Sequence, residues 1–357
     1  MYSLHKGDCL PWLKSLESAS VDCVFVDLPY FGIVDEAWDN QWKTRDIYLD
    51  WVCLLAEQFK RITKSNSSIF LFCDEKMEAY IQVRLDEIFL LLNKIVWFKR
   101  NNLPQKNAHL LRTFAPMTER ALFYTTQYNS TGWEAVKLDM NNFMPLREYF
   151  RNAYLQSGLN YKKINQALGT ASNGGGMASH YFGDIGQWDL PTQEQYQQLQ
   201  TIKELNLTKS YEALRQEYEA LRRPFNADKK TWDVIEFPII GGDENTEHPT
   251  TKPLGLYRRI LSVITEPNQV VLDCCMGSGT AGVVAVELGR SFLGCEIDPK
   301  YFSIAQARIK KAAQSPSFYT LPNNRLHLTG GGLPATQSSF TAEVIPPAKL
   351  PAKSPRR

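Results

Sequence analysis

The sequence predicts an α/β fold with an open parallel sheet that is circularly permuted, with a mainly α-helical insert between its two halves. First, residues 270–296 have the pattern strand, glycine turn, helix and strand. Second, this unit lies so late in the chain that the other strands of its sheet must come from upstream. Third, residues 1–126 contain several strand and helix patterns, whereas residues 127–230 contain no strand–turn–helix unit of this kind.

The late unit has the pattern of a nucleotide-binding crossover. Val270–Asp273 is apolar up to its last residue, the glycine turn Gly277–Gly279 follows, and helix formers run from Ala281 to Leu288. The second apolar run, Ser291–Cys295, ends at Glu296, which lies 19 residues after Gly277. A ribose-hydroxyl acceptor belongs at about this distance. The glycine motif alone would fit a plain turn in an α/β sheet equally well.

The N-terminal stretch begins the other half of the sheet. Tyr2–His5 is a short strand pattern, and Pro11 fits the first turn of the helix that follows. Val21–Val26 has the pattern of a buried strand and ends at the tetrapeptide Asp27–Tyr30. This tetrapeptide fits a plain turn, but it also places a carboxylate and an aromatic ring at the carboxyl end of a strand. Open α/β sheets bind their ligands at that edge.

Apolar spacing predicts the remaining elements of this half. Helices are expected over residues 46–61 and 75–85, and strands over residues 68–73, 93–99 and 119–124.

The insert has helical spacing over residues 146–155, 161–168 and 177–182, and a helix opens after Pro191. Helix, glycine turn and helix in succession is a helix-turn-helix-like pattern. An apolar stripe over residues 211–221 indicates a further helix that packs into a small core of its own.

The segment from 231 to 313 completes the sheet. A strand is expected over residues 232–237 and a helix over residues 254–264. Thr251 can cap this helix, and Pro253 suits its first turn. A carboxylate ligand is favoured at such a helix start, and Lys252 adds a full positive charge there. Residues 314–357 are rich in Pro, Ser, Thr and Gly, so a disordered tail is expected.

The composition excludes few classes of protein. The 357 residues carry a net charge of +2, so any surface for nucleic acid must be locally basic. The seven cysteines show no C-x-x-C spacing, which favours buried free thiols in a reducing cytoplasm and gives no reason to expect a metal site. Neither a membrane span nor a signal peptide is expected.

Three motifs together resemble one enzyme family. Asp27-Leu-Pro-Tyr30 resembles the D-P-P-Y motif of DNA amino-methyltransferases, which methylate exocyclic amines of DNA bases. Asp273–Thr280 resembles their D-x-F-x-G-S-G-T element for S-adenosyl-L-methionine, and His248–Pro253 resembles their H-P-T-x-K-P element. The catalytic motif precedes the cofactor motif, as in the permuted β group of the family. The resemblance covers roughly residues 1–125 and 230–312.

The resemblance implies a Rossmann-like methyltransferase sheet that binds S-adenosyl-L-methionine and acts on a flipped-out base of double-stranded DNA. Asp27 and the Leu28 carbonyl would accept the amine hydrogens, and Tyr30 would stack on the base. Glu296 would hold the ribose and Asp8 the cofactor's adenine amine. The expected catalytic residues are Asp27, Leu28, Pro29 and Tyr30. The expected cofactor-binding residues are Asp8, Cys9, His248, Thr251, Lys252, Asp273, Gly277, Ser278, Gly279, Thr280, Glu296 and Asp298.

The resemblance also places a target-recognition region at residues 127–230. The basic, amide-rich segment from Lys99 to Arg112 is either a solvated loop or a loop against DNA phosphates. The residues expected to contact DNA are Lys99, Arg100, Lys106, Arg112, Lys162, Lys163 and His180. A homodimer and a cognate restriction endonuclease stay open as further partners.

Two departures from the family pattern affect the expected site. Leu28 replaces the usual proline, which reduces the rigidity of the turn, and Cys274-Cys275-Met276 replaces a more usual Pro-Phe-Ala. Asp27 favours adenine N6 as the target, because the cytosine-N4 enzymes usually begin the tetrapeptide with serine. A cytosine-N4 enzyme and a catalytically weak DNA-binding relative remain the alternatives. Carbon-5 cytosine methylation is excluded because the chain has no Pro-Cys pair, and protein-glutamine methyltransferases carry the cofactor motif first.

Overall fold

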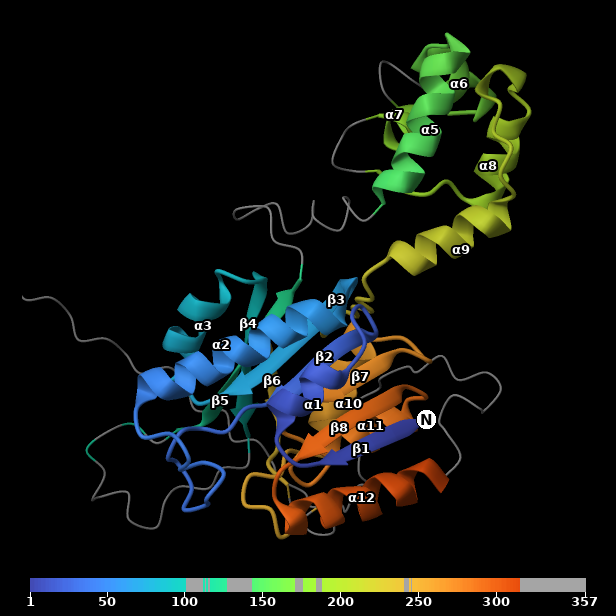
Figure 1. Cartoon of the computed structure of the whole chain (residues 1–357). Coiled ribbons are helices and arrows are strands. Elements are labelled where there is room, and N and C mark those ends of the chain that lie inside the picture. The colour runs from blue at the N-terminus through green and yellow to red at the C-terminus, as the bar shows by residue number, and fades with distance from the viewer. Residues whose placement is uncertain are drawn as a thin grey trace, which may run out of the picture. The chain divides into compact units, whose positions relative to one another are not determined.

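A single eight-stranded sheet organises the computed structural model (Figure 1). The strand order is β1-β8-β7-β2-β3-β5-β4-β6, and β5 is antiparallel to its neighbours β3 and β4 while the other pairs are parallel. The late strands β7 and β8 lie between the early strands β1 and β2, so the prediction of a permuted α/β sheet is confirmed. The structure describes residues 1–100, 112, 114, 116–126, 143–170, 176–183, 188–240, 244 and 246–314.

The described strands and helices follow the expected order. The strands are β1 Tyr2–Lys6, β2 Val21–Asp27, β3 Thr63–Cys73, β4 Leu90–Lys99, β5 Thr118–Thr125, β6 Val234–Phe237, β7 Val270–Asp273 and β8 Ser291–Glu296. The helices are α1 Cys9–Ser15, α2 Arg45–Ile62, α3 Glu78–Leu85, α5 Met144–Ser157, α6 Tyr161–Ala167, α7 Gly176–Phe182, α8 Gln193–Gln200, α9 Tyr211–Leu221, α10 Leu254–Ile264, α11 Thr280–Glu287 and α12 Pro299–Gln314. Strand β3 begins at Thr63, well before the expected residue 68. The prediction missed its first residues because they are polar and lack the apolar pattern of a buried strand.

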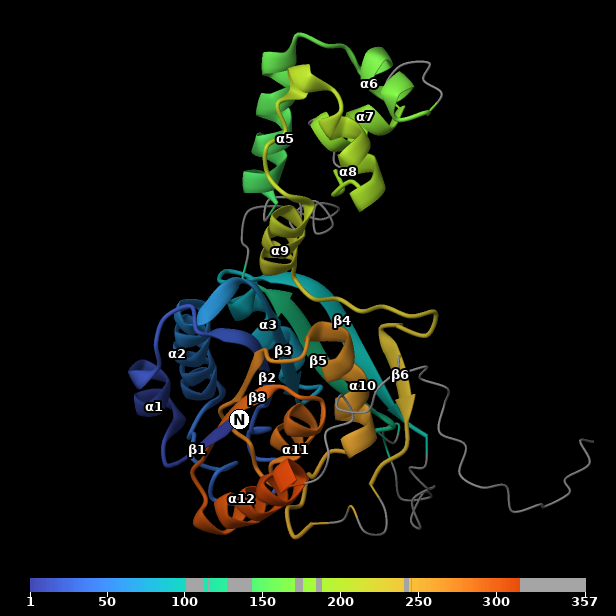
Figure 2. The same cartoon turned by 90° about the vertical axis from the view of Figure 1, so that its right-hand side faces the viewer.

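Helices α1, α2 and α3 cover one face of the sheet, and α10, α11 and α12 cover the other (Figure 2). An apolar core lies between each group of helices and the sheet. Successive residues of β2 alternate between the two cores: Val24 and Val26 face the core shared with α1, α2 and α3, whereas Cys23 and Phe25 face the core shared with α10, α11 and α12. A strand buried on both faces has a continuous apolar run, as residues 23–26 do.

The insert has a third core of its own. Phe150, Ile164, Tyr196 and Leu214 are fully buried in it, one from each of α5, α6, α8 and α9. Gly158 ends α5 at φ 65°, a left-handed conformation that glycine adopts without strain. The expected helix–glycine–helix pattern and separate core are therefore confirmed, while the domain bounds stay a prediction.

Some expectations fall outside the described residues. These are Lys106 and the tail after residue 314. None of the described helices combines the length and the apolar character that a membrane crossing requires.

Phe25 tests how the sheet is packed against α10. Its ring is fully buried, 5.2 Å from the Phe70 ring and 4.7 Å from the Tyr257 ring. We expect Phe25→Ala to lower the free energy of unfolding by about 3–5 kcal/mol in urea titrations, because a large cavity is left. Ile47→Ala on the exposed face of α2 is the control and should change the free energy by less than about 0.5 kcal/mol. An equal loss in both variants would contradict this account of the core.

Candidate active site

A cavity lies at the carboxyl edge of the sheet, where several strands end together. Asp8, Asp27, Asp273 and Glu296 follow or end β1, β2, β7 and β8, and all four line this cavity. Its empty space, including the open mouth, is about 1150 Å³. The strand order brings these carboxylates together although they are far apart in the chain.

A buried ammonium group joins the two halves of the chain at this edge. The Lys252 Nζ lies 2.5 Å from Asp27 Oδ2 and 3.3 Å from Glu119 Oε2, and its side chain is only 4% exposed. It also donates to the Tyr30 hydroxyl at 2.8 Å, and that hydroxyl lies 3.0 Å from a carboxylate oxygen of each acid. Lys99 binds the other Glu119 oxygen at 2.7 Å. The arrangement holds a carboxylate and a phenol in fixed positions inside the cavity.

The charges in this cluster shift one another's pKa values. Burial raises the pKa of Asp27, and the nearby Glu119 carboxylate raises it further against the opposing effect of Lys252. Burial acts on Glu119 in the same sense, but Lys252 and Lys99 outweigh it and lower the pKa of Glu119. Burial disfavours the charge on Lys252, yet the two carboxylates raise its pKa, so the group stays an ammonium.

The turn after β2 is fixed from several sides. The Leu28 N–H donates to the Phe72 carbonyl at 3.1 Å, and the Tyr48 hydroxyl donates to the Pro29 carbonyl at 2.8 Å. The fully buried Asp39 carboxylate accepts four backbone N–H groups, those of Tyr30, Phe31, Ile33 and Val34. Asp39 therefore organises the loop that carries Tyr30 toward the cavity.

The glycine turn after β7 leaves room for close contacts. Gly277 has φ 49°, and a Cβ there would lie 2.9 Å from the His248 Nε2. Its N–H donates to Glu296 Oε2 at 2.8 Å, which ties the turn to the end of β8. Gly279 has φ 79°, and a Cβ there would lie 2.8 Å from the Cβ of Ala305. Glycine is therefore required at both positions.

His248 forms part of the cavity wall as a neutral ring. It stacks on Trp38 with 5.6 Å between ring centroids and meets Tyr301 edge-on at 4.4 Å. Burial, with the positive charge of Lys252, lowers the pKa of His248 to about 4. The ring is therefore an uncharged donor or acceptor near neutral pH.

Most of the expected cofactor residues line the same cavity. They are Asp8, Cys9, His248, Thr251, Lys252, Asp273, Gly277, Ser278, Thr280 and Glu296. The four residues of the tetrapeptide Asp27–Tyr30 line it as well.

One expected role needs correction, that of Thr251 as a helix cap, and three other expected cofactor residues stay predictions. Lys252 is paired with Asp27 and Glu119, so its charge already has partners in the absence of a cofactor. Thr251 does not cap α10, whose N-cap residue is Pro253 without a side-chain bond; its hydroxyl lies 3.2 Å from that of Ser278 instead. Asp298 accepts the N–H groups of Lys300 and Tyr301 at the start of α12 and is not among the residues that line the cavity, and Gly279 is also outside that set.

The residues expected to contact DNA differ in their exposure. Lys99 is 18% exposed and bound to Glu119, so a DNA phosphate would compete with this ion pair, and the assignment of Lys99 to DNA stays a prediction. Arg100 is 60% exposed, with Glu236 3.5 Å away. Arg112 is exposed, Lys162 and Lys163 are exposed on α6, and His180 is half-buried on α7.

Glu119 and Asp39 were missed by the sequence analysis. Glu119 lies at the start of β5, and only the antiparallel direction of β5 brings the start of this strand to the carboxyl edge of the sheet. Asp39 lies in a segment without strand or helix spacing. The sequence held no signal for Asp39. For Glu119 the only signal was its place as an acid at the start of the expected strand 119–124.

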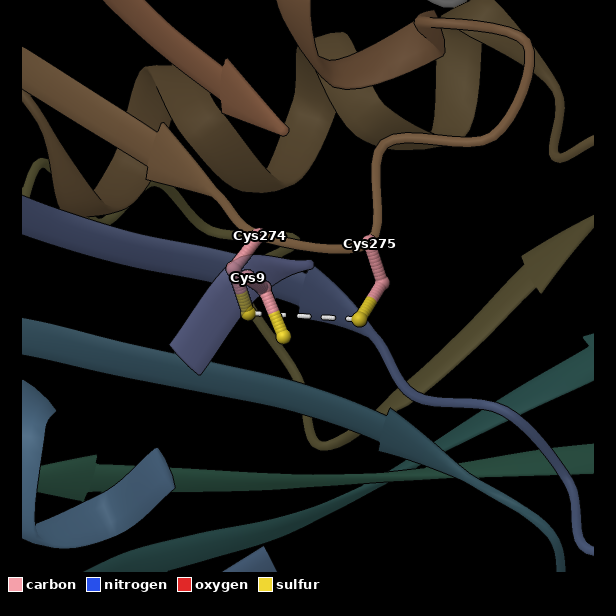
Figure 3. Close-up of side chains that lie close together, drawn as sticks. All are labelled: Cys9, Cys274 and Cys275. Carbon is pink, nitrogen blue, oxygen red and sulfur yellow. Dashed lines mark hydrogen bonds between the residues drawn. The ribbon is translucent and has the colours of Figure 1, made fainter. Parts of the chain in front are cut away.

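The cysteines also show an arrangement that their spacing hid. All seven are free, and five are buried, as expected, while Cys53 and Cys275 are half-buried. Cys9, Cys274 and Cys275 lie together at the cavity, with their sulfur atoms within 4.8 Å of one another (Figure 3).

Comparison with known proteins finds a matching family and two similar relatives. A family model described as DNA methylase matches residues 21–307. The chain is 24% identical to DNA adenine methyltransferase YhdJ of Escherichia coli (strain K12) over 314 residues, which cover 86% of this chain and 82% of that protein. It is 24% identical to Type II methyltransferase M.HinfI of Haemophilus influenzae over 332 residues, which cover 87% of this chain and 69% of that protein.

Solved structures show the same fold. The M1.HpyAVI–SAM complex is similar with a TM-score of 0.50 and 21% identity, covering 87% of this chain and 99% of that one. The PvuII DNA methyltransferase, described as cytosine-N4-specific, has a TM-score of 0.50 and 15% identity, covering 86% of each chain.

Removing the buried ammonium should expose its structural role. In Lys252→Met, Asp27 and Glu119 face each other without their shared cation, so we expect the free energy of unfolding near neutral pH to fall by about 3–5 kcal/mol. The double variant Lys252→Met/Glu119→Gln should regain part of this loss, because one of the two negative charges is gone. Urea unfolding followed by circular dichroism measures both. If the double variant were as unstable as the single one, repulsion between the carboxylates would not be the cause.

Proposed function

Because the chain belongs to the DNA methylase family, we propose that it transfers the methyl group of S-adenosyl-L-methionine to the N6 amine of adenine in double-stranded DNA. S-adenosyl-L-methionine is the methyl donor of this family. The observation that carries the proposal is the Asp27 carboxylate, which lines the cavity and is held there by Lys252 and Tyr30.

The residues around the cavity suit a bound S-adenosyl-L-methionine. Glu296 and Asp8 are acceptors at the ends of β8 and β1, where the ribose hydroxyls and the adenine amine would bind. Gly277, Ser278 and Thr251 line the cavity as well, and the methionine part would lie against them. When bound, the cofactor supplies an electrophilic methyl group on a positively charged sulfur.

The target base must leave the duplex to reach Asp27. An amine inside a base pair cannot approach a methyl donor in line, so the nucleotide would flip into the cavity at a cost of a few kcal/mol. Tyr30, whose ring is fixed through its hydroxyl, would stack on the flipped base and recover part of that cost.

Catalysis would come mainly from positioning and electrostatics. The Asp27 carboxylate and the Leu28 carbonyl would accept the two amine hydrogens and direct the nitrogen lone pair at the methyl group. The amine proton would then pass to the Asp27 carboxylate or to solvent. Lys252 keeps Asp27 oriented, and Glu119 compensates part of the charge of Lys252, so that Asp27 remains a good acceptor.

Adenine is favoured over cytosine by the acid at the first position of the tetrapeptide. YhdJ, one of the relatives above, is named an adenine methyltransferase, and this supports the same choice. The second candidate, cytosine N4, is favoured by the likeness to the PvuII enzyme in fold. The exocyclic amines of both bases would meet the same acceptors, so the two candidates share one mechanism.

The helical insert is the proposed target-recognition region. It has its own core and exposes Lys162 and Lys163 on one helix, which suits phosphate contacts. Arg100, Arg112 and His180 are kept as further proposed contacts.

Nucleoside mass analysis of DNA treated with protein and S-adenosyl-L-methionine tests the reaction. We expect N6-methyladenine, and we expect Asp27→Asn to lower kcat by about 10²–10³-fold because the acceptor loses its charge. Asp46→Asn on the exposed first turn of α2 is the matched control and should keep full activity.

The other outcomes separate the alternatives. Detection of N4-methylcytosine would show that cytosine is the target base, and the proposed mechanism would be unchanged. If no base were methylated while the cofactor still bound, the chain would be a DNA-binding relative without turnover.

The pH profile tests the electrostatic coupling. The negative charge of Glu119 is one cause of the raised pKa of Asp27, so Glu119→Gln should lower that pKa. Since Asp27 must be ionised to act, its ionised fraction at acidic pH rises, and the acid limb of kcat/KM should move to lower pH. Glu57→Gln on the exposed face of α2 is the control. A limb that stays in place or moves to higher pH would show that another group controls it.

A further inference from the structure

Three thiols meet at the cavity from two distant parts of the chain. Cys9 is the first residue of α1, and Cys274 and Cys275 directly follow β7. Figure 3 shows the three sulfur atoms turned toward one another. The grouping follows from the strand order, because β1 and β7 flank β8 and end at the same edge.

The distances suit a metal ion held by thiolates. The Cys274 and Cys275 sulfurs are 3.9 Å apart, and all three sulfurs lie within 4.8 Å of one another. Zinc–thiolate bonds of about 2.3 Å place the sulfur atoms about 3.8–4.0 Å apart in tetrahedral or trigonal geometry. Small side-chain rotations would therefore close the set around one ion.

The surroundings leave a path for the ion and a free position beside it. Cys9 and Cys274 are 9% and 2% exposed, so two of the ligands are shielded from bulk water. Cys275 is half-buried, and all three residues line the open cavity. Three protein ligands with one position open to the cavity is the coordination of zinc sites that keep an exchangeable ligand.

We propose that Cys9, Cys274 and Cys275 form a three-thiolate site for a soft divalent metal ion of the zinc type, and that the occupied site competes with S-adenosyl-L-methionine. Each thiol that binds the ion releases its proton to solvent, so three thiolates and one divalent ion carry a net charge of −1. The ion and its fourth ligand would fill cavity space next to Asp8 and Gly277. The competition rests on the proposed placement of the cofactor in this cavity, whereas metal binding itself does not.

Cobalt(II) is the probe for the site. The reduced, metal-free full-length protein is titrated with Co²⁺ under anaerobic conditions, and thiolate-to-cobalt charge-transfer absorption is followed in the near ultraviolet. We expect one equivalent to bind and Zn²⁺ to displace it. Cys9→Ser and Cys275→Ser should each weaken binding by roughly a hundredfold, since a ligand is lost. Cys53→Ser on α2, outside the cavity lining, is the control and should bind as the unmodified chain does.

Alkylation gives a readout that does not depend on the variants' folding. In the unmodified chain, saturating Zn²⁺ should slow the labelling of Cys9 and Cys275 by iodoacetamide, measured by peptide mass analysis, and leave the labelling rate of Cys53 unchanged. Absence of the cobalt band, a band that persists in the Cys9→Ser/Cys275→Ser double variant, or equal labelling with and without Zn²⁺ would each overturn the site.

Cofactor binding tests the second half of the proposal. Zn²⁺ should raise the Kd of S-adenosyl-L-methionine at least about tenfold in the unmodified chain and in Cys53→Ser, but not in Cys275→Ser. An unchanged Kd alongside a normal cobalt band would overturn the competition and keep the metal site. Failure of the cofactor to bind at all would count against the proposed function, and the cobalt titration would still decide the site.

Discussion

The buried ammonium of Lys252 is the interaction on which the site depends. It bonds Asp27 from the early half of the chain and Glu119 from an antiparallel strand, while Lys252 itself belongs to the late half. Ionised groups are costly to bury, so this cluster is stable only because each charge has an opposite partner and hydrogen bonds at short distance. The same condition fixes the position of Asp27, since a carboxylate that must satisfy a buried cation cannot turn away from it. The contacts that stabilise the buried charges are therefore the same contacts that orient the Asp27 carboxylate.

The sheet supplies the second constraint, because it decides which residues can meet. Parallel strands β1, β2, β7 and β8 all end at one edge, and each is followed by residues that line the cavity. The order of these strands in the chain is immaterial as long as the order in the sheet is kept. A permuted chain can therefore build the same site with the cofactor half at its end. The cysteine cluster has the same origin: residues 9 and 274 become neighbours only because β8 lies between β1 and β7.

Much of this could be predicted from the sequence, since it rests on local patterns. The glycine turn at Gly277, the strand ending at Asp27 and the late position of the cofactor motif were enough for the permuted sheet and for most of the cavity lining. The pairing of strands that are distant in sequence could not be predicted from local patterns. The direction of β5, which brings Glu119 to the cavity, leaves no periodicity in residues 118–125. The partners of Lys252 could not be foreseen for the same reason: its position before a helix suggested an anion site, whereas Asp27 and Glu119 are far away in sequence.

Leu28 shows how tertiary contacts replace a local device. A proline at this position would restrict the turn by its ring, and leucine removes that restriction. Here the neighbouring bonds supply it instead: the Leu28 N–H is bound to the Phe72 carbonyl, the Pro29 carbonyl to Tyr48, and the next N–H groups to Asp39. Proline has no N–H, so the bond to Phe72 is available only because the residue is not proline. The Leu28 side chain is 2% exposed and packs in the core shared with α2. This packing also holds the turn in place. The Leu28 carbonyl is therefore held between two fixed neighbours, and the loss of a proline at this position does not imply a loose acceptor.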